Sequence, residues 1–254
     1  MLGIDDRLRG MLRSGKPLYG VGVGIPEPAL VEMVGYAGYD YVVVDNEHGP
    51  ASIERTEHMF RAARCAGIPP VARIIQEADI LRYLDIGASG IQMPMIETAE
   101  QAARVVAACR YYPEGNRGAA FSTRAASYGF LDRAEHVKRS NEGVAVILMI
   151  ETKTGVDNLD EILKVKGIDC VLVGATDLSF SLGYPNNAKH PVVQEAIRSC
   201  VAKILEAGVA PGGLAMNGPD CQEGVKLGMR YMTSLMSLVV GKALRSTLAE
   251  LKGG

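Results

Sequence analysis

The chain has little net charge, no long apolar run and no closely spaced pair of cysteines. A formal net charge of −2 over 254 residues gives no electrostatic footprint for nucleic acid, and no run of Lys or Arg suggests a membrane surface. No apolar run approaches the ~20 residues that span a bilayer, and the opening MLGIDDRLRG lacks the pattern of a signal peptide. We therefore expect neither a nucleic-acid partner nor a membrane partner.

The cysteines are scattered and follow no C-x-x-C spacing. Their number is odd, which argues for free thiols in a reducing compartment and against a disulfide framework. They are Cys65, Cys109, Cys170, Cys200 and Cys221. We predict a cytoplasmic protein in which most of these thiols are small core residues.

What the chain does contain is a repeated alternation of short apolar runs with segments of helical period. Hydrophobic residues make up 48% of the sequence, which is enough for one large core. The strand-like runs are Leu18–Gly24, Tyr39–Val44, Pro70–Ile74, Gly90–Met95, Val144–Ile150, Asp169–Val173, Ala210–Ala215 and Met229–Leu235. Between them, helical stretches begin near Pro26, Ser52, Thr98 and Pro191, and several helices are expected to end at Gly67, Gly87, Gly208 or Gly228.

Eight strands that alternate with helices indicate parallel βαβ units. An open doubly wound sheet is the competing architecture, but no G-x-G-x-x-G motif follows an early strand, and the glycines of Gly20–Gly24 lie within one. The count of eight favours closure. We predict an α/β fold with one (β/α)8 TIM-barrel domain spanning residues 1–254.

Polar side chains gather where the predicted strands end, which is the edge at which the functional residues of parallel barrels meet. They are Asp45, Glu47 and His48 in VVVDNEHGP, Arg73 in VAR, Glu151 in LMIET and Asp177 in VLVGATDLS. Each residue alone has a structural explanation, as a helix cap, an ion pair or a hydrogen-bonded histidine. Their convergence on one mouth favours a shared site.

Two carboxylates on adjacent strand ends, without thiolates or paired histidines, suit a hard cation such as Mg²⁺ or Mn²⁺. The carboxylate and keto oxygens of a 2-oxo acid would complete its coordination, and the cation would act as a Lewis acid. Histidine is the side chain most often used for proton transfer near neutrality, which makes His48 a candidate base. Arg73 is placed to stabilise negative charge on a keto oxygen. The sequence therefore predicts a metal centre at Glu151 and Asp177.

A resemblance to a known family covers nearly the whole chain. Arg73 and five strings carry it in order: VDNEHGP, IQMPMIETAEQA, YYPEGNRG, MIETKTGVDNLDEI and VGATDLSFSLG. Together they resemble the HpcH/HpaI aldolase family, whose members are metal-dependent class II pyruvate aldolases on a (β/α)8 barrel. Family members commonly form hexamers that exchange the last helix between subunits. The resemblance implies a lyase that cleaves a 4-hydroxy-2-oxo acid to pyruvate and an aldehyde, and a homo-oligomer.

The resemblance also implies individual roles. Glu151 and Asp177 ligate a divalent metal (Mg²⁺, Mn²⁺ or Co²⁺), His48 is the base and Arg73 stabilises the enolate. Asp85, in LDIGASG, matches a carboxylate that raises the basicity of the histidine, and Asp45 is a second candidate for that task. The backbone at Ala175 and Thr176 is expected to hold the pyruvate carboxylate. Met149 departs from the family, where Gln contacts the substrate, and a thioether is a poor hydrogen-bond partner.

Three alternatives stay open. The first is a CoA-ester lyase of the citrate or malyl-CoA type on the same fold. The second is a non-catalytic barrel, and the third a Schiff-base aldolase, although Lys153 and Lys164–Lys166 lie in or around a helix and not inside a strand end. The irregular stretch Tyr111–Ser127 is expected to be either a lid over the site or a surface loop. Together with Arg124 and a subunit interface, it is expected to select the aldehyde.

Overall fold

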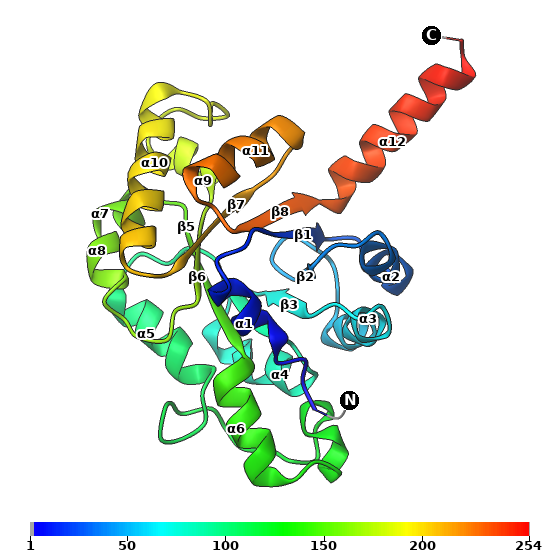
Figure 1. Ribbon diagram of the computed structural model, residues 1–254, viewed down its shortest axis with the longest axis vertical. Helices are drawn as coiled ribbons and strands as arrows, with labels where there is room; N and C mark the ends of the chain where they lie inside the picture. The colour runs from blue at the N-terminus through cyan, green and yellow to red at the C-terminus, as the bar shows by residue number, and fades with distance from the viewer. Residues whose placement is uncertain (1–2, 254) are drawn as a thin grey trace.

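The structure, a computed structural model, describes residues 3–253, so the outermost residues of the predicted domain lie outside it. Eight parallel strands close into a barrel in chain order, β1 to β8 (Figure 1). They are β1 Leu18–Val23, β2 Tyr41–Asp45, β3 Pro70–Arg73, β4 Gly90–Met93, β5 Ala145–Ile150, β6 Cys170–Val173, β7 Ala210–Leu214 and β8 Tyr231–Leu235. The predicted (β/α)8 barrel is confirmed, and each strand lies within two residues of its predicted run.

Helices surround the barrel and connect consecutive strands (Figure 1). The longer ones are α2 Pro28–Tyr36, α3 Ile53–Cys65, α5 Ala99–Ala108, α6 Arg133–Gly143, α10 Pro191–Glu206, α11 Gly218–Leu227 and α12 Met236–Leu251. The shorter ones are α1 Arg7–Arg13, η1 Glu77–Asp79, α4 Ile80–Asp85, η2 Arg124–Gly129, α7 Lys153–Asp157, α8 Leu159–Ile162 and α9 Ala175–Ser181.

Local sequence signals account for the helix ends. Ser52 caps α3 by accepting from the backbone N–H of Arg55, and Thr98 forms a capping box with Gln101 at the start of α5. The four glycines expected at helix ends all have positive φ, the conformation in which glycine costs least. These signals depend only on neighbouring residues, which is why the sequence predicts them well.

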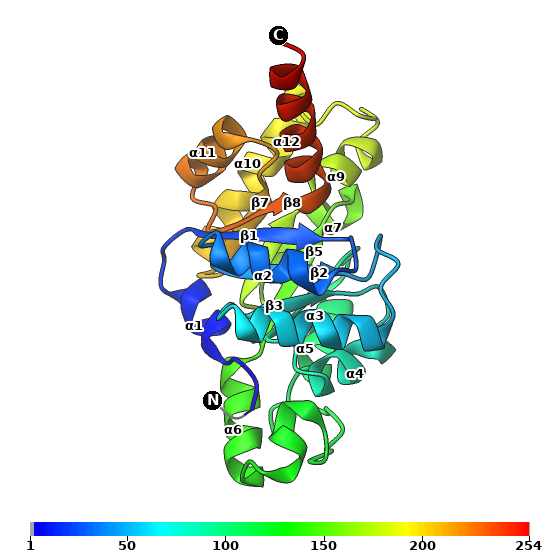
Figure 2. The same cartoon turned by 90° about the vertical axis from the view of Figure 1, so that its right-hand side faces the viewer.

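Two apolar layers hold the barrel. Inward-facing side chains such as Val43, Ile147 and Leu172 fill its interior, and Leu8 and Leu12 of α1 pack with them. A second core lies between the strands and the helices. Since Leu8 lies against the first residue of β4, Gly90, α1 closes the end of the barrel at which the strands begin (Figure 2). The opposite end, where the strands finish, is left for the polar residues.

The stretch Tyr111–Ser127 does not cover its own strand ends. It joins α5 to α6, and it makes contacts with α6 and with the ends of α4 and α5 at which those helices finish. Arg124 Nη1 donates to the carbonyl of Ile86 at 2.8 Å, directly after α4. The lid prediction is therefore wrong within one chain, because the stretch follows a helix and not a strand.

The last helix leaves the barrel. Figures 1 and 2 show α12 projecting away from the other helices, with the C-terminus at its far end. Its apolar side chains Leu244, Leu248 and Leu251 are exposed. A groove of about 590 Å³ runs between α12, β1, β8 and α11. An apolar helix face and an apolar groove are thus both uncovered in one chain.

Of the cysteines, all five are free, and Cys109, Cys170 and Cys200 are buried, as predicted for core thiols. Within residues 3–253, no helix is long and apolar enough to cross a membrane. The cytoplasmic location stays a prediction.

Candidate active site

An ionic cluster joins the ends of β2 and β3. Asp45 and Arg73 are the last residues of these strands and are register partners. Arg73 Nε donates to Asp45 Oδ1 at 2.9 Å, Nη2 donates to Oδ2, and Nη1 lies 3.3 Å from Glu47 Oε2. Burial acts to raise the pKa of Asp45, but the hydrogen bonds and the charge of Arg73 outweigh it, so the pKa is lowered. The guanidinium is thereby fixed at the mouth of the barrel.

The loop after β2 turns tightly around the same carboxylate. The backbone N–H groups of Glu47 and His48 donate to Asp45 Oδ1 at 3.1 and 3.2 Å. A Cβ at Gly49 would lie 2.2 Å from the carbonyl oxygen of Asp45, so this turn requires glycine. Asp45 therefore organises the backbone that carries His48 and makes no hydrogen bond to its ring.

The ring of His48 points outward. Its side chain is 70% exposed, and Nε2 lies 3.7 Å from Glu47 Oε2. Glu47 thus bridges Arg73 and His48, a role that the strand-end pattern did not assign to it. Burial raises the pKa of Glu47, although Arg73 and His48 act against the shift. The signal in the sequence was the position of Glu47 between Asp45 and His48, which are already predicted to act together.

Glu151 follows β5 and is buried. Its Oε1 accepts from the backbone N–H of Met95 at 2.8 Å, and its Oε2 packs against Gly174 so closely that a Cβ there would be 2.5 Å away. Burial, together with the negative charges of Asp177 and Glu47, raises the pKa of Glu151 to about 7. The site therefore holds a carboxylate whose charge is poorly compensated.

Asp177 lies in the first turn of α9, directly after β6, and is exposed. Because β5 and β6 are neighbours in the barrel, its charge acts on Glu151. Ala175 and Thr176 begin the same helix, whose first N–H groups have no partner in the helix. The carboxylate pair predicted from the sequence is thus brought together at one edge of the mouth.

The donor set fits a hard cation with few protein ligands. Within residues 3–253, no group of three or more His, Cys, Asp and Glu side chains is arranged to hold a metal ion. Glu151 and Asp177 are two oxygen donors whose mutual repulsion a divalent cation relieves. Such a cation needs further oxygens from water or from a substrate, which suits a catalytic site better than a structural one.

Asp85 lies elsewhere. It ends α4, and its Oδ1 accepts from Arg117 Nη2 at 2.8 Å. Among the described residues it makes no hydrogen bond with His48, because α4 carries it toward the end of the barrel where the strands begin. The prediction that Asp85 tunes His48 is therefore not met within one chain.

Met149 is buried in the barrel interior. Its sulfur accepts a hydrogen bond from Gln92 Nε2 at 3.2 Å, and Tyr231 Oη donates to Gln92 Oε1 at 3.1 Å. An amide group in contact with Met149 is thus supplied by Gln92 of β4. Contact of Met149 with a substrate stays a prediction.

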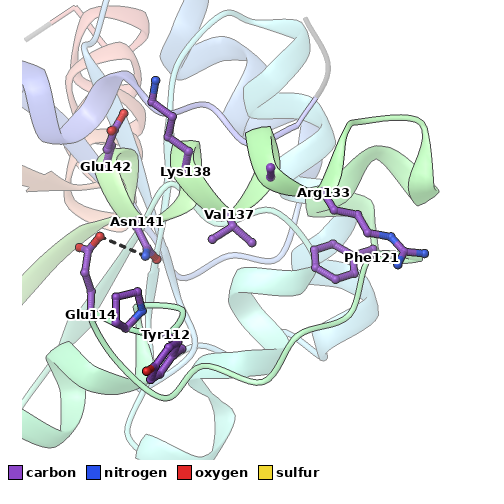
Figure 3. A pocket seen from close by; sticks show the side chains of 10 residues that line it. Tyr112, Glu114, Phe121, Arg133, Val137, Lys138, Asn141 and Glu142 are labelled. Carbon is purple, nitrogen blue, oxygen red and sulfur yellow. Dashed lines mark hydrogen bonds between the residues drawn. The ribbon is translucent and has the colours of Figure 1, made fainter.

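A separate hollow of about 540 Å³ lies beside α6 (Figure 3). Tyr112, Phe121 and Arg133 are among its lining residues, and Asn141 donates to Glu114 across it. None of the predicted site residues lines this hollow. The hollow is therefore separate from the predicted site residues at the strand ends.

Known proteins resemble this chain over nearly its whole length. The profile described as HpcH/HpaI aldolase/citrate lyase matches residues 20–233. The chain belongs to this family. The 2-keto-3-deoxy-L-rhamnonate aldolase of Salmonella gallinarum (strain 287/91 / NCTC 13346) is 38% identical over 245 residues, which cover 95% of this chain and 91% of that protein.

Solved structures agree with the family assignment. A HpcH/HpaI aldolase/citrate lyase family protein from Burkholderia cenocepacia J2315 is 33% identical with a TM-score of 0.92, covering 97% of this chain and 99% of that one. The citrate synthase SbnG is 30% identical with a TM-score of 0.87, covering 97% of both chains. The resemblance read from the sequence motifs is confirmed.

Proposed function

We propose that this chain is a divalent-metal-dependent aldolase that cleaves a 4-hydroxy-2-oxo acid into pyruvate and an aldehyde, and that it also catalyses the reverse addition. The observation that carries the proposal is the buried, poorly compensated carboxylate of Glu151 beside Asp177, with Arg73 on the same mouth. The 38% identical relative, which is named as an aldolase, supports it.

Glu151 and Asp177 are the residues that would hold the metal. When bound there, Mg²⁺, Mn²⁺ or Co²⁺ supplies Lewis-acid polarisation of the keto oxygen of the substrate. The choice among the three is not determined by carboxylate ligands. Met95 donates to one oxygen of Glu151 and thereby fixes the direction of the other.

The remaining steps belong to side chains of the protein. His48 accepts the proton of the 4-hydroxyl group while the bond between C3 and C4 breaks and the aldehyde forms. The electron pair of that bond becomes the enolate of pyruvate, and the guanidinium of Arg73 stabilises the charge on its oxygen. His48 then gives this proton to C3 of the enolate, which completes pyruvate and restores the neutral base. The N–H groups at Ala175 and Thr176 are proposed to receive the pyruvate carboxylate.

We further propose a homo-oligomer, a hexamer by resemblance, in which α12 packs into the corresponding groove of a second copy. The uncovered apolar face of α12 and the adjacent groove support this exchange. A role for Asp85 at His48 also requires a neighbouring chain, since its own chain holds it beside Arg117. In the proposed oligomer, a second copy thus covers the apolar face of α12, and a neighbouring chain supplies Asp85 to the site.

Exchange of the pyruvate methyl protons in D2O, followed by NMR, tests enolate formation without an aldehyde. We expect exchange that needs Mg²⁺ or Mn²⁺, is lost on chelation and disappears in Glu151→Gln. The matched control is Glu206→Gln, which changes an exposed glutamate at the end of α10. Absence of exchange with every metal would contradict the proposal and favour a CoA-ester lyase, which cleavage of a citrate- or malyl-CoA thioester would then test.

A further inference from the structure

A residue with a strained backbone touches the proposed metal site. Among residues 3–253, four residues other than glycine have a positive φ: Met95, Ser127, Tyr128 and Asn186. The last three lie in η2 or between α9 and α10, whereas Met95 directly follows β4 and donates its N–H to Glu151. A left-handed backbone brings Cβ close to the following carbonyl oxygen, so it persists only where the surroundings hold it. Such outliers cluster at functional sites.

The local sequence does not relieve this strain. Pro94, which precedes Met95, has a restricted φ and no N–H group. In turns where proline is followed by a residue with positive φ, that second residue is usually glycine or asparagine. Here it is methionine, with a φ of 56°. The chain therefore keeps an unfavourable conformation at the point where β4 reaches the mouth of the barrel.

The positive φ directs two successive N–H groups to the same neighbouring strand. The N–H of Met95 donates to Glu151 Oε1 at 2.8 Å, directly after β5. The N–H of Ile96 donates to the carbonyl of Met149, within β5, at 3.1 Å. An extended strand would turn two successive residues to opposite sides. The left-handed backbone is therefore what allows both bonds to form.

The far side of the turn is anchored to α7. Glu97 Oε1 accepts from Thr152 Oγ1 at 2.7 Å, and the carbonyl of Glu97 accepts from Asn158 Nδ2 at 2.9 Å. A Cβ at Gly155 would lie 2.7 Å from the carbonyl oxygen of Ile96, so the start of α7 packs directly on the turn. The residues around Met95 are thus held independently of Met95 itself.

The side chain of Met95 contributes little to this arrangement. It is half exposed (50%), whereas its N–H occupies one oxygen of the buried Glu151. The other oxygen, Oε2, is left for a metal and packs against Gly174. Contacts that orient a metal ligand are typically worth about 10- to 100-fold in metal affinity.

We propose that Met95 is a positioning residue whose left-handed backbone, and not its side chain, pre-forms the Glu151 carboxylate for the metal. This inference rests on the proposed aldolase function and adds how the ligand is held in place before the metal binds. The strain is maintained by the contacts of Ile96 and Glu97 on the far side of the turn.

The test compares Met95→Val with Met95→Gly in the full-length, metal-stripped protein, with the Kd for Mn²⁺ measured by isothermal titration. Valine is branched at Cβ and resists a positive φ, whereas glycine adopts it freely. We expect Met95→Val to weaken Mn²⁺ binding by about tenfold or more, and Met95→Gly to bind several-fold more tightly than Met95→Val. A role for the side chain predicts the opposite order, because valine keeps an apolar group and glycine has none.

Met33→Val is the control, since Met33 is exposed on the outer helix α2 and should leave the affinity unchanged. Thermal unfolding shows whether each variant folds. Wild-type affinity in a folded Met95→Val protein, or weaker binding in Met95→Gly than in Met95→Val, would overturn the inference. If Met95→Val does not fold, a loss of more than about tenfold in Met95→Gly would overturn it.

The wild-type protein separates this inference from the proposed function. If its pyruvate methyl exchange depends on metal while the order of the two variants is reversed, the aldolase function stands and only the role of Met95 fails. If the wild-type protein binds no divalent metal, both fail.

Discussion

Gly174→Ala should weaken metal binding although it removes no ligand. Gly174 has an ordinary φ of −82°, so alanine causes no backbone strain there. The new Cβ would lie 2.5 Å from Oε2 and 2.8 Å from Cβ of Glu151, and real Cβ contacts essentially never fall below 3.0 Å. The carboxylate must therefore move by about half an ångström, whereas metal–ligand distances tolerate only about 0.2 Å.

Misplacement of this size should reduce the affinity for Mn²⁺ by about 10- to 100-fold, the range typical of a lost orienting contact around a metal ligand. Isothermal titration of the metal-stripped protein measures it. Gly10→Ala in α1 is the matched control, because its Cβ would meet nothing within 4 Å. Thermal unfolding of both variants separates a local effect from loss of the fold. Wild-type affinity in a folded Gly174→Ala protein would refute Glu151 as a metal ligand in this geometry.

Three further perturbations test other parts of the structure. Arg73→Lys removes the paired hydrogen bonds that the guanidinium donates to Asp45. We expect it to slow pyruvate proton exchange by about 10²- to 10³-fold with little change in KM. An unaltered exchange rate would contradict the proposed role of Arg73. Burial, with the charges of Arg117 and Arg139, lowers the pKa of His136 to about 4. The unfolded chain therefore takes up a proton first as the pH falls below 6.5, and the free energy of unfolding should drop by up to about 3 kcal/mol between pH 6.5 and 4. In denaturant titrations, the free energy of unfolding of His136→Gln should fall less than that of the wild type over this pH range. Identical pH profiles of the two proteins would contradict the prediction. Leu244→Asp with Leu248→Asp should reduce the molar mass measured by light scattering, and an unchanged mass would argue against exchange of α12.

The sequence predicts the features that depend on near neighbours. Strand positions follow from short apolar runs bounded by turns, and helix ends follow from Ser52, Thr98 and the glycines that take positive φ. The rule that parallel strands end at one edge then brings Glu151 and Asp177 together without any knowledge of side-chain conformation. Family motifs add roles, and the confirmed family makes those roles worth testing.

The environment of the site depends on contacts between distant segments. Glu151 takes a hydrogen bond from Met95, 56 residues away, and packs on Gly174. Asp85 is bound by Arg117, 32 residues away, and no pattern within either segment predicts that pair. The assignment of Asp85 to His48 failed within one chain because a helix following a strand runs back toward the end where the next strand starts.

Because the helices run back toward the end where the strands begin, the two kinds of connection lie at opposite ends of the barrel. Residues on the connections after strands lie at the mouth of their own barrel, whereas residues on the connections after helices lie at the opposite end. Tyr111–Ser127, Arg117 and Asp85 all belong to the second group. If they act in catalysis, they act at the mouth of a neighbouring barrel. Disrupting the proposed exchange of α12 should then lower aldol addition even though Glu151, Asp177 and Arg73 are all supplied by one chain.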